Sequence, residues 1–460
     1  MSNDATLNDR TRDDAYDLSP QVVERVLAAL DADDNAAVRR LLAPIHAADV
    51  ADLLEQISSA DRERLIRALG RDLEGETLPE LDENVRDEVL EYVEDEILAD
   101  AVKDMDSDDV VYLVEDLEGA AQAKVLDALD DDDRAVVEQS LSYPEDSAGR
   151  MMQRELVMAP THWNVGQMID YMRDAEDLPD PFYDVIIVDP AMKPAGVISL
   201  SRIMGARRPV LLSEIMSEDF RAIPVEQDEE EVAYAFSQYH LVSAPVVDAD
   251  GRLVGVITID DAVEAMGEEA EEDLLRLGGV GDESLADRVW TTTRLRFPWL
   301  AVNLITSILA SLVIAQFDEV IAAYVALAVL LPIVASMGGN AGTQSLTVAV
   351  RALATKDLTP SNMWRVILRE TLVGLGNGLV FAVIIGIVGY VWFGDAMLGL
   401  VLGMAMVANL VVAGMAGILI PIGLDKAGAD PALASGAFVT TVTDVVGFFA
   451  FLGLAAAMLL

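Results

Sequence analysis

The sequence contains no cysteine and only three histidines. The lack of cysteine excludes disulfides, thiolate metal sites and thiol catalysis. The three histidines lie in unrelated segments: His46, His162 and His240. The sequence shows no convincing arrangement of a nucleophile and a general base around any of them. We therefore do not expect an enzyme.

Positive charge is also scarce. Thirty-one basic residues face 79 acidic ones, and the net charge of −48 divides into about −45 before Phe297 and −3 after it. This imbalance argues against nucleic-acid binding and suits cations as ligands or counterions. Two explanations account for the excess of acidic residues. One is metal sensing at particular sites, and the other is the acidic surface of a halophilic protein. Because the carboxylates spread over the whole first part, salt adaptation is the better explanation for most of them.

The first part begins with a polar, acidic segment, residues 1–17, which is unlike a signal peptide and is expected to be disordered. Residues 18–142 carry apolar side chains at helical spacing, for example Val50, Leu53, Leu54 and Ile57, and predict an acidic, all-α N-terminal domain. Proline and glycine in the segment 143–149 mark its end.

Two similar units fill residues 143–261. DVIIVDPAMKPAGVISL (184–200) and SAPVVDADGRLVGVITIDD (243–261) each read as strand, acidic turn and strand, with a hairpin signal at Asp250-Gly251. The pair resembles tandem α/β CBS domains. In that family a Gly-x-x-(Ser/Thr)-x-x-Asp stretch holds the ribose of an adenine nucleotide, and Gly255, Thr258 and Asp261 match it. The first unit has Arg202 in place of the aspartate, so ATP or another adenine nucleotide as a cofactor and a purely structural module both stay open.

Residues 262–296 form a linker. Its segment 262–285 predicts an acidic helix that ends at the glycines of 278–281. Such a helix either transmits movement or is a solvated connector.

From Phe297 onward, five apolar segments are long enough to cross a bilayer: 297–317, 320–350, 371–392, 396–423 and 431–460. Pro332 and several glycines interrupt the second, which predicts a discontinuous helix. The basic residues that follow Phe297 fall into two loops, 351–369 and the loop at Lys426. The positive-inside rule then places these loops and the first part in the cytoplasm. We expect a multi-pass cell-membrane protein in contact with lipid, its N-terminal domains cytoplasmic and residues 297–460 forming a transmembrane domain.

Asp444 is, in this division, the only acid deep in a span, and Thr440 lies one turn before it. A membrane carboxylate without a basic partner is expected to be protonated, to hold a cation, or to bond a neighbouring helix. Asp430 is expected to cap the last helix. In SMGGNAGTQS (336–345), Asn340 and Gln344 share a helical face and offer oxygens that suit Mg²⁺, although small-residue packing explains the glycines equally well.

The order of these features, together with GGNAGTQ and TVTDV, resembles the MgtE family of magnesium channels over about residues 20–460. The resemblance implies a homodimer with a central pore in residues 297–460, selective for Mg²⁺ at Asp444 and Asn340. It also implies regulatory Mg²⁺ near the linker, or plug, helix. The matching acids are Asp108, Asp261, Glu264, Glu269, Glu272 and Asp273.

The sequence thus predicts a multidomain membrane protein: an all-α N-terminal domain, tandem α/β CBS domains and five transmembrane helices. Its predicted function is Mg²⁺ uptake down the electrochemical gradient, closed by cytosolic Mg²⁺. Two alternatives stay open, a secondary transporter that exchanges divalent cations for protons and a CBS-type membrane protein that senses adenylates.

Overall fold

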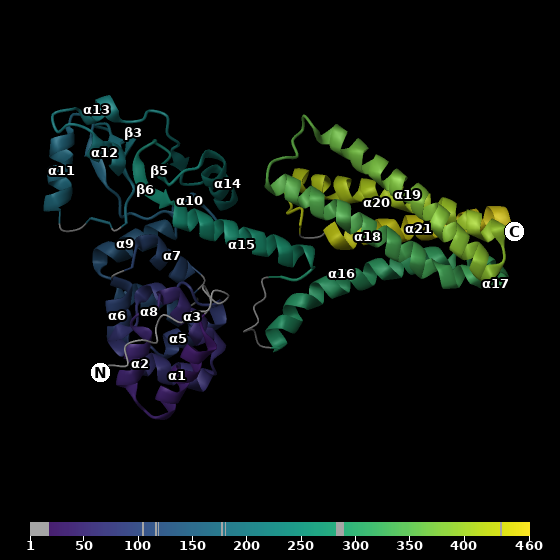
Figure 1. Cartoon of the computed structure of the whole chain (residues 1–460), viewed down its shortest axis with the longest axis horizontal. Coiled ribbons are helices and arrows are strands. Elements are labelled where there is room, and N and C mark those ends of the chain that lie inside the picture. Colours follow the sequence, from purple (N-terminus) through teal and green to yellow (C-terminus); the bar gives the residue numbers. More distant parts are fainter. Residues whose placement is uncertain are drawn as a thin grey trace, which may run out of the picture. The chain divides into compact units, whose positions relative to one another are not determined.

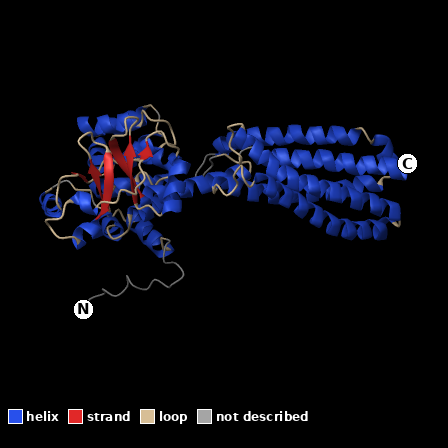
Figure 2. Cartoon of the chain, turned by 90° about the horizontal axis from the view of Figure 1, so that it is seen from above, coloured by secondary structure: helices blue, strands red, loops and turns tan. Residues whose placement is uncertain are grey.

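The computed structural model describes residues 18–460 except 104, 116, 118, 176, 177, 180, 282–288, 433 and 434. The chain divides into two compact units, one ending at Gly267 and one starting at Glu268. The first combines helices with two small sheets, and the described part of the second is helical (Figures 1 and 2). The segment 1–17, expected to be disordered, lies outside the described residues, and the domain limits drawn from the sequence stay a prediction.

The N-terminal part of the first unit is all helical, as predicted. The apolar face of each amphipathic helix is the buried face. One core, for example, contains Val50, Leu53, Leu54 and Ile57. Side chains of Asp34, Ser58 and Asp130 cap helices. The elements are α1 (Pro20–Asp31), α2 (Asn35–Leu42), α3 (Ala47–Gln56), α4 (Ser59–Leu69), η1 (Gly70–Asp72), η2 (Gly75–Thr77), α5 (Glu83–Tyr92), α6 (Asp95–Lys103), α7 (Ser107–Glu115), α8 (Ala120–Ala128) and α9 (Asp131–Ser140).

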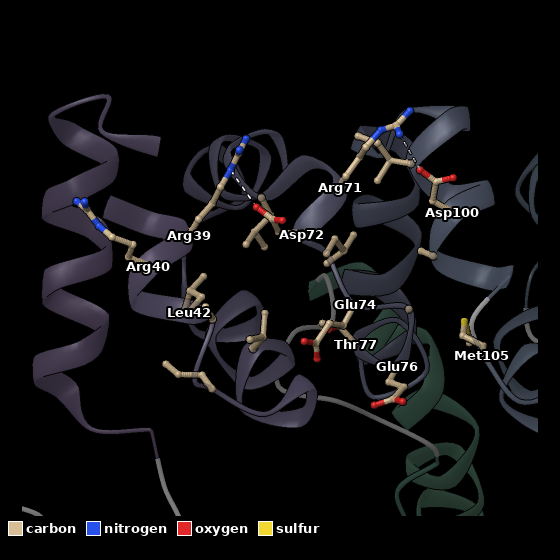
Figure 3. Close-up of a pocket in the computed structure, with 18 residues that line it drawn as sticks. Arg39, Arg40, Leu42, Arg71, Asp72, Glu74, Glu76, Thr77, Asp100 and Met105 are labelled. Carbon is tan, nitrogen blue, oxygen red and sulfur yellow. Dashed lines mark ion pairs between the residues drawn. The ribbon is translucent and has the colours of Figure 1, made fainter. Parts of the chain in front are cut away.

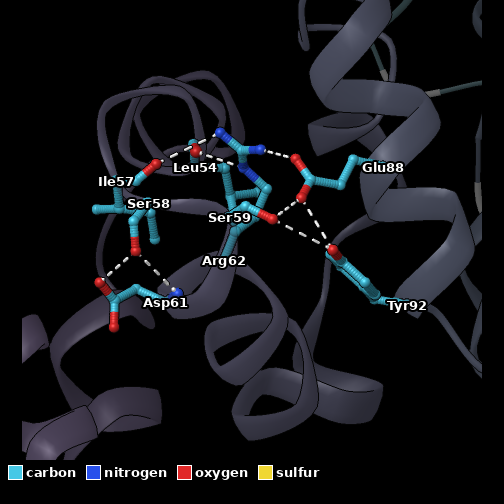
Figure 4. A network of polar contacts seen from close by, with 8 residues as sticks. All are labelled: Leu54, Ile57, Ser58, Ser59, Asp61, Arg62, Glu88 and Tyr92. Atoms are coloured by element: carbon cyan, nitrogen blue, oxygen red, sulfur yellow. Dashed lines mark hydrogen bonds and ion pairs between the residues drawn. The ribbon is translucent and has the colours of Figure 1, made fainter.

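One buried ion pair ties α4 to α5 (Figure 4). Arg62 is 7% exposed, donates to the carbonyl of Leu54 at 2.8 Å and pairs with Glu88. Burial alone would raise the pKa of Glu88, but hydrogen bonds from Ser59 and Tyr92 and the charge of Arg62 lower it. The network satisfies the buried guanidinium, so these two helices are held in one register.

The two predicted α/β units are confirmed as a repeat. Each has a three-stranded sheet whose first two strands are parallel and whose last two form an antiparallel hairpin. Asp189 and Asp248 accept two backbone N–H bonds each in the two hairpin turns. The residue two positions before the second strand of each hairpin, Met192 or Gly251, has positive φ. The elements are α10 (Ala148–Met151), β1 (Met158–Pro160), α11 (Val165–Asp174), β2 (Asp184–Val188), β3 (Pro194–Ser199), α12 (Leu200–Gly205), α13 (Leu212–Ile215), β4 (Ile223–Pro224), α14 (Glu229–Tyr239), β5 (Ser243–Val247) and β6 (Leu253–Thr258).

The first part of the linker forms a helix, α15 (Ile259–Leu277), which ends before the glycines as predicted, and residues 289–296 are the start of the helix α16. The boundary between the two units falls within it.

Five helices of the second unit are long and apolar enough to cross a membrane, as predicted. Their bounds correct the expected ones, since several continue past the apolar core: α16 (Val289–Ala315), α18 (Ala326–Ala354), α19 (Met363–Phe393), α20 (Ala396–Lys426) and α21 (Ser435–Leu459). The second span is not discontinuous: α18 continues through Pro332 and its glycines, and only its expected beginning separates, as α17 (Asp318–Ala323). These helices give the described part of the second unit the make-up of a multi-pass membrane domain.

Close approach of backbones packs these helices. A Cβ atom at Gly414 would lie 2.7 Å from the carbonyl oxygen of Glu370, and one at Gly399 would lie 2.5 Å from that of Gly386. Apolar side chains gain little by leaving lipid for a helix interface, so small residues that bring backbones together are the expected means of association. α20 is accordingly the most buried of the five helices.

Candidate metal sites and ion path

Acidic residues from two helices gather inside the first unit. Asp106, Asp108 and Asp109 stand at the start of α7, and Asp261 and Glu264 stand at the start of α15. Asp108 and Asp109 each feel the charge of Asp261. The fold therefore brings together three residues that the sequence nominated separately, Asp108, Asp261 and Glu264. Below, these five residues are called the acid cluster.

Burial first, and then repulsion from neighbouring carboxylates, raises the pKa values of the four aspartates of this cluster. The pKa of Asp109 rises to about 7, and that of Asp108 lies well above its usual range. The pKa of Asp261 rises to about 6, although hydrogen bonds from Thr258 oppose the shift. The charge of Glu76 adds to the repulsion on Asp106 and Asp109. A cation placed here would lower the energy of the ionised form.

Within the described residues, no three carboxylate or imidazole side chains lie close enough to form a ready-made metal site. Glu76 also lines a cavity of about 630 Å³ in the helical part of the unit (Figure 3). The charges of that cavity largely satisfy one another, with Arg39 at 3.4 Å from Asp72 and Arg71 at 3.4 Å from Asp100. None of the five residues of the acid cluster lines this cavity, so the two are separate features of the unit.

Thr258 and Asp261 bond each other at the beginning of α15. The backbone N–H of Thr258 donates to Asp261 Oδ2 at 3.0 Å, and its hydroxyl donates to the same oxygen at 2.9 Å. This is half of a capping box, in which the third helical residue accepts from the residue before the helix. The pair predicted to hold a nucleotide thus has a helix-capping role in this structure.

The other nominated acids of α15, Glu269, Glu272 and Asp273, belong to the second unit. Arg276 pairs with Glu272 and, at 2.7 Å, with Asp430 Oδ2 in the loop before α21. Burial, followed by the charge of Asp430, raises the pKa of Asp273. Asp430 Oδ1 accepts from the backbone N–H of Ala432 at 2.7 Å. Because α21 is described only from Ser435 and residues 433 and 434 lie outside the described residues, the expected capping of the last helix by Asp430 stays a prediction.

Asp444 lies half-buried in the middle of α21. Within the described residues it makes no hydrogen bond and no ion pair, so its carboxylate is free for a ligand. The hydroxyls of Thr440 and Thr441 donate to the carbonyls of Gly436 and Ala437 four residues back. A hydroxyl that donates in this way keeps its lone pairs available to a cation or to its water shell.

Asn340 and Gln344 both lie exposed on α18, on a face that also carries Ser336, Thr343 and Thr347. The side-chain N–H of Asn340 donates to Ser336 Oγ at 3.5 Å. No described residue donates a hydrogen bond to its side-chain oxygen, so this oxygen is available to a ligand. This face meets α21, because a Cβ atom at Gly339 would lie 3.9 Å from Thr440 Cγ2. The structure thus brings the two membrane motifs of the sequence side by side, and below they are called the polar face.

Two buried polar residues of the membrane helices were missed. Asp444 is not the only acid in a span: Glu370 lies two turns inside α19, is 6% exposed and accepts from Ser345 Oγ of α18 at 3.1 Å. It lay one residue outside the expected third span, 371–392, but its spacing of four from Gly374 and of eight from Gly378 is the signal of a packed helix face. Asn409, fully buried in α20, was also missed inside a long apolar run.

Models of three known families match the chain. A model described as a divalent cation transporter matches residues 331–454, one described as the MgtE intracellular N domain matches residues 45–146, and a CBS domain model matches residues 212–268.

Proteins that carry the name magnesium transporter MgtE are similar over most of their length. The protein of Thermus thermophilus is 32% identical over 453 residues, which cover 94% of this chain and 97% of that one. The protein of Enterococcus faecalis is 35% identical over 69% of this chain and 70% of its own length. That of Bacillus subtilis is 28% identical over 95% of this chain and 98% of its own.

Among solved structures, the cytosolic domain of the Mg²⁺ channel MgtE in complex with ATP aligns with a TM-score of 0.49 and 28% identity. It covers 53% of this chain and 99% of that one.

Proposed function

Because this chain belongs to the MgtE family, we propose that it transports Mg²⁺ across the cell membrane through a path at the polar face, and that cytosolic Mg²⁺ closes this path. One observation carries the proposal: Asp444 is a carboxylate in an apolar helix for which the described residues provide no partner, one turn from Thr440, which meets the row of amide and hydroxyl side chains on α18. Hard oxygen ligands of this kind suit Mg²⁺, which keeps several of its waters.

The membrane potential is sufficient to drive uptake. It contributes about 2.3 kcal/mol per elementary charge per 100 mV, so a divalent cation gains about 4.6 kcal/mol. One negative charge per chain attracts such an ion while binding it weakly enough to release it. A secondary transporter would instead couple Asp444 to protons, and Mg²⁺ flux measured with and without a pH gradient separates the two.

The path requires a second copy of the chain. The polar face presents five exposed polar side chains of α18 together with Thr440 and Asp444 on an otherwise apolar surface. Facing lipid, such groups would be costly. In a homodimer whose two polar faces meet, they would instead surround a hydrated cation, with one Asp444 from each subunit.

The acid cluster supplies the sensor for closure. Without a divalent cation its carboxylates repel one another, as the raised pKa values of Asp109 and Asp261 indicate. Mg²⁺ would bridge α7 and the start of α15, directly or through its waters, and steady the linker helix. Three further acids of α15 would extend this sensor along the helix toward Arg276: Glu269, Glu272 and Asp273.

For the CBS-like pair we propose that ATP or another adenine nucleotide binds, with its ribose held by Asp261. The spacing of Gly255, Thr258 and Asp261 supports it. Because Thr258 and Asp261 bond each other, a bound ribose would have to share that carboxylate. Calorimetric titration of ATP into the protein and into a Thr258→Ala variant tests this: equal affinity would contradict the assignment.

The transport proposal is tested by Mg²⁺ flux into liposomes that contain the purified protein. Asp444→Asn should reduce the flux at least ten-fold while the protein still assembles. Glu319→Gln, which removes the same charge from the exposed helix α17, is the matched control and should leave the flux unchanged. Normal flux in Asp444→Asn would refute the ion path.

Closure is tested on α15. Replacing Glu269, Glu272 and Asp273 by alanine should leave the path open at cytosolic Mg²⁺ concentrations that close the parent. Alanine at Glu268 and Glu271, which are exposed on the same helix, serves as the control. Closure of the triple variant at the parent's concentration would show that these acids only solvate the helix.

A further inference from the structure

Asn409 is a polar side chain in the apolar middle of α20 and is fully buried. Its Nδ2 donates to the carbonyl oxygen of Val334 in α18 at 2.8 Å. No described residue donates to its Oδ1. A buried oxygen without a hydrogen-bond partner is destabilising, and an apolar side chain would avoid that cost. The amide is therefore expected to have a role that an apolar side chain could not fill.

The amide separates two other helices. It packs against Gly338 of α18 and Gly447 of α21, neither of which has room for a side chain. A Cβ atom at Gly338 would lie 2.9 Å from Asn409 Cγ, and one at Gly447 would lie 2.7 Å from Nδ2. Such distances are shorter than real carbon contacts, so the flat amide, fixed by its bond to Val334, sets how closely α18 and α21 approach.

The two candidate ligands stand close to this contact. Asn340 follows Gly338 by two residues, so it lies about 3 Å from Gly338 along the axis of α18. Asp444 precedes Gly447 by three residues, so it lies about 4.5 Å from Gly447 along the axis of α21. Because the second and fifth of five spans run in opposite directions, both displacements point toward the cytosol. Asn340 and Asp444 therefore stand at a similar depth, within one helical turn of Asn409.

We propose that Asn409 is a positioning residue that sets the separation of Asn340 and Asp444, and thereby the preference of the path for Mg²⁺ over larger divalent cations. The inference rests on the proposed function. Mg²⁺ demands a near-octahedral shell of fixed radius, whereas Ca²⁺ accepts six to eight oxygens at longer distances. A change in helix spacing of less than an ångström is thus enough to alter the preference.

The spacing is measured without transport. The chain has no cysteine, so Gly339→Cys combined with Thr440→Cys gives a single oxidisable pair, at two positions of α18 and α21 that lie in van der Waals contact. Oxidative crosslinking within one chain should be fast in this background. Adding Asn409→Ala should slow it at least five-fold.

Selectivity is measured as the ratio of Mg²⁺ to Ca²⁺ flux in liposomes. Asn409→Ala should lower the ratio at least five-fold. Gly447→Ala, which presses on the same amide from α21, should lower it too and keeps the test decisive if Asn409→Ala does not assemble. Gly453→Ala on the same helix, where a Cβ atom meets nothing within 4 Å, should leave both readouts unchanged.

Ser345→Ala removes a different buried hydrogen bond of α18 and separates positioning from stability. It should lower the melting temperature without changing the flux ratio. Unchanged crosslinking and an unchanged ratio in Asn409→Ala and Gly447→Ala would overturn the inference. If the parent carried no Mg²⁺ flux, the proposed function would fail, and crosslinking would still decide whether Asn409 sets the spacing.

Discussion

Raising the pH in the absence of divalent cations should loosen the acid cluster. Asp109 and Asp261 have folded-state pKa values of about 7 and about 6, against 3.8 for an ordinary aspartate. The folded protein therefore holds protons that the unfolded chain has already lost. The stability due to these protons is complete below pH 3.8 and is lost as the pH rises through about 7.

The size of the effect follows from these values. Between pH 6 and pH 8, ionisation of Asp109 should cost the folded state about 1 kcal/mol, and ionisation of Asp261 should add a smaller cost of the same sign. Together they should shift the equilibrium for local opening by about ten-fold. Mg²⁺ should reverse the change, because a ligand of the folded state stabilises it by about 2.7 kcal/mol at a concentration 100 times its Kd.

Hydrogen exchange of the intact protein measures this locally. Amides of α7 and of the first two turns of α15 should lose protection between pH 6 and pH 8, after correction for the intrinsic exchange rate and at constant ionic strength. Asp109→Asn should remove most of the loss and weaken the effect of Mg²⁺. Glu91→Gln, an exposed acid of α5, should remove neither. Equal protection at both pH values in the parent would refute the reasoning.

Three further predictions concern other parts of the chain. Arg62→Ala should destabilise the helical part of the first unit by about 1–3 kcal/mol, because the half-buried Glu88 and the carbonyl of Leu54 both lose the buried guanidinium. Arg67→Ala, at an exposed pair, should cost at most about 0.5 kcal/mol, and chemical denaturation measures both. Arg276→Ala should speed protease cleavage within α15, because the ion pair with the loop before α21 is lost; unchanged cleavage would show that the contact is weak. Cysteine in place of Asp395 should react with an impermeant reagent from outside and cysteine in place of Lys356 only from inside, and the reverse pattern would overturn the five-span topology.

Much of the architecture could be predicted from local pattern. The amphipathic helices, the repeated strand–turn–strand units and five apolar spans depend on periodicity and hydropathy, which neighbouring residues determine. The orientation in the membrane follows from charge in the loops. The nomination of Asp444 required only that a lone carboxylate in an apolar run is costly.

The tertiary structure alone decided which polar residues meet. Asp108 and Asp261 repel each other although more than 150 residues separate them in the sequence. A local sequence pattern cannot show that two such distant residues lie close together. Asn409 reads as a single polar residue in an apolar run, and only the glycines of two other helices show what it separates. Arg276 likewise became a partner of Asp430 through folding. Hydropathy assigns residues to the membrane one helix at a time, whereas a site made of several helices depends on the distances between them.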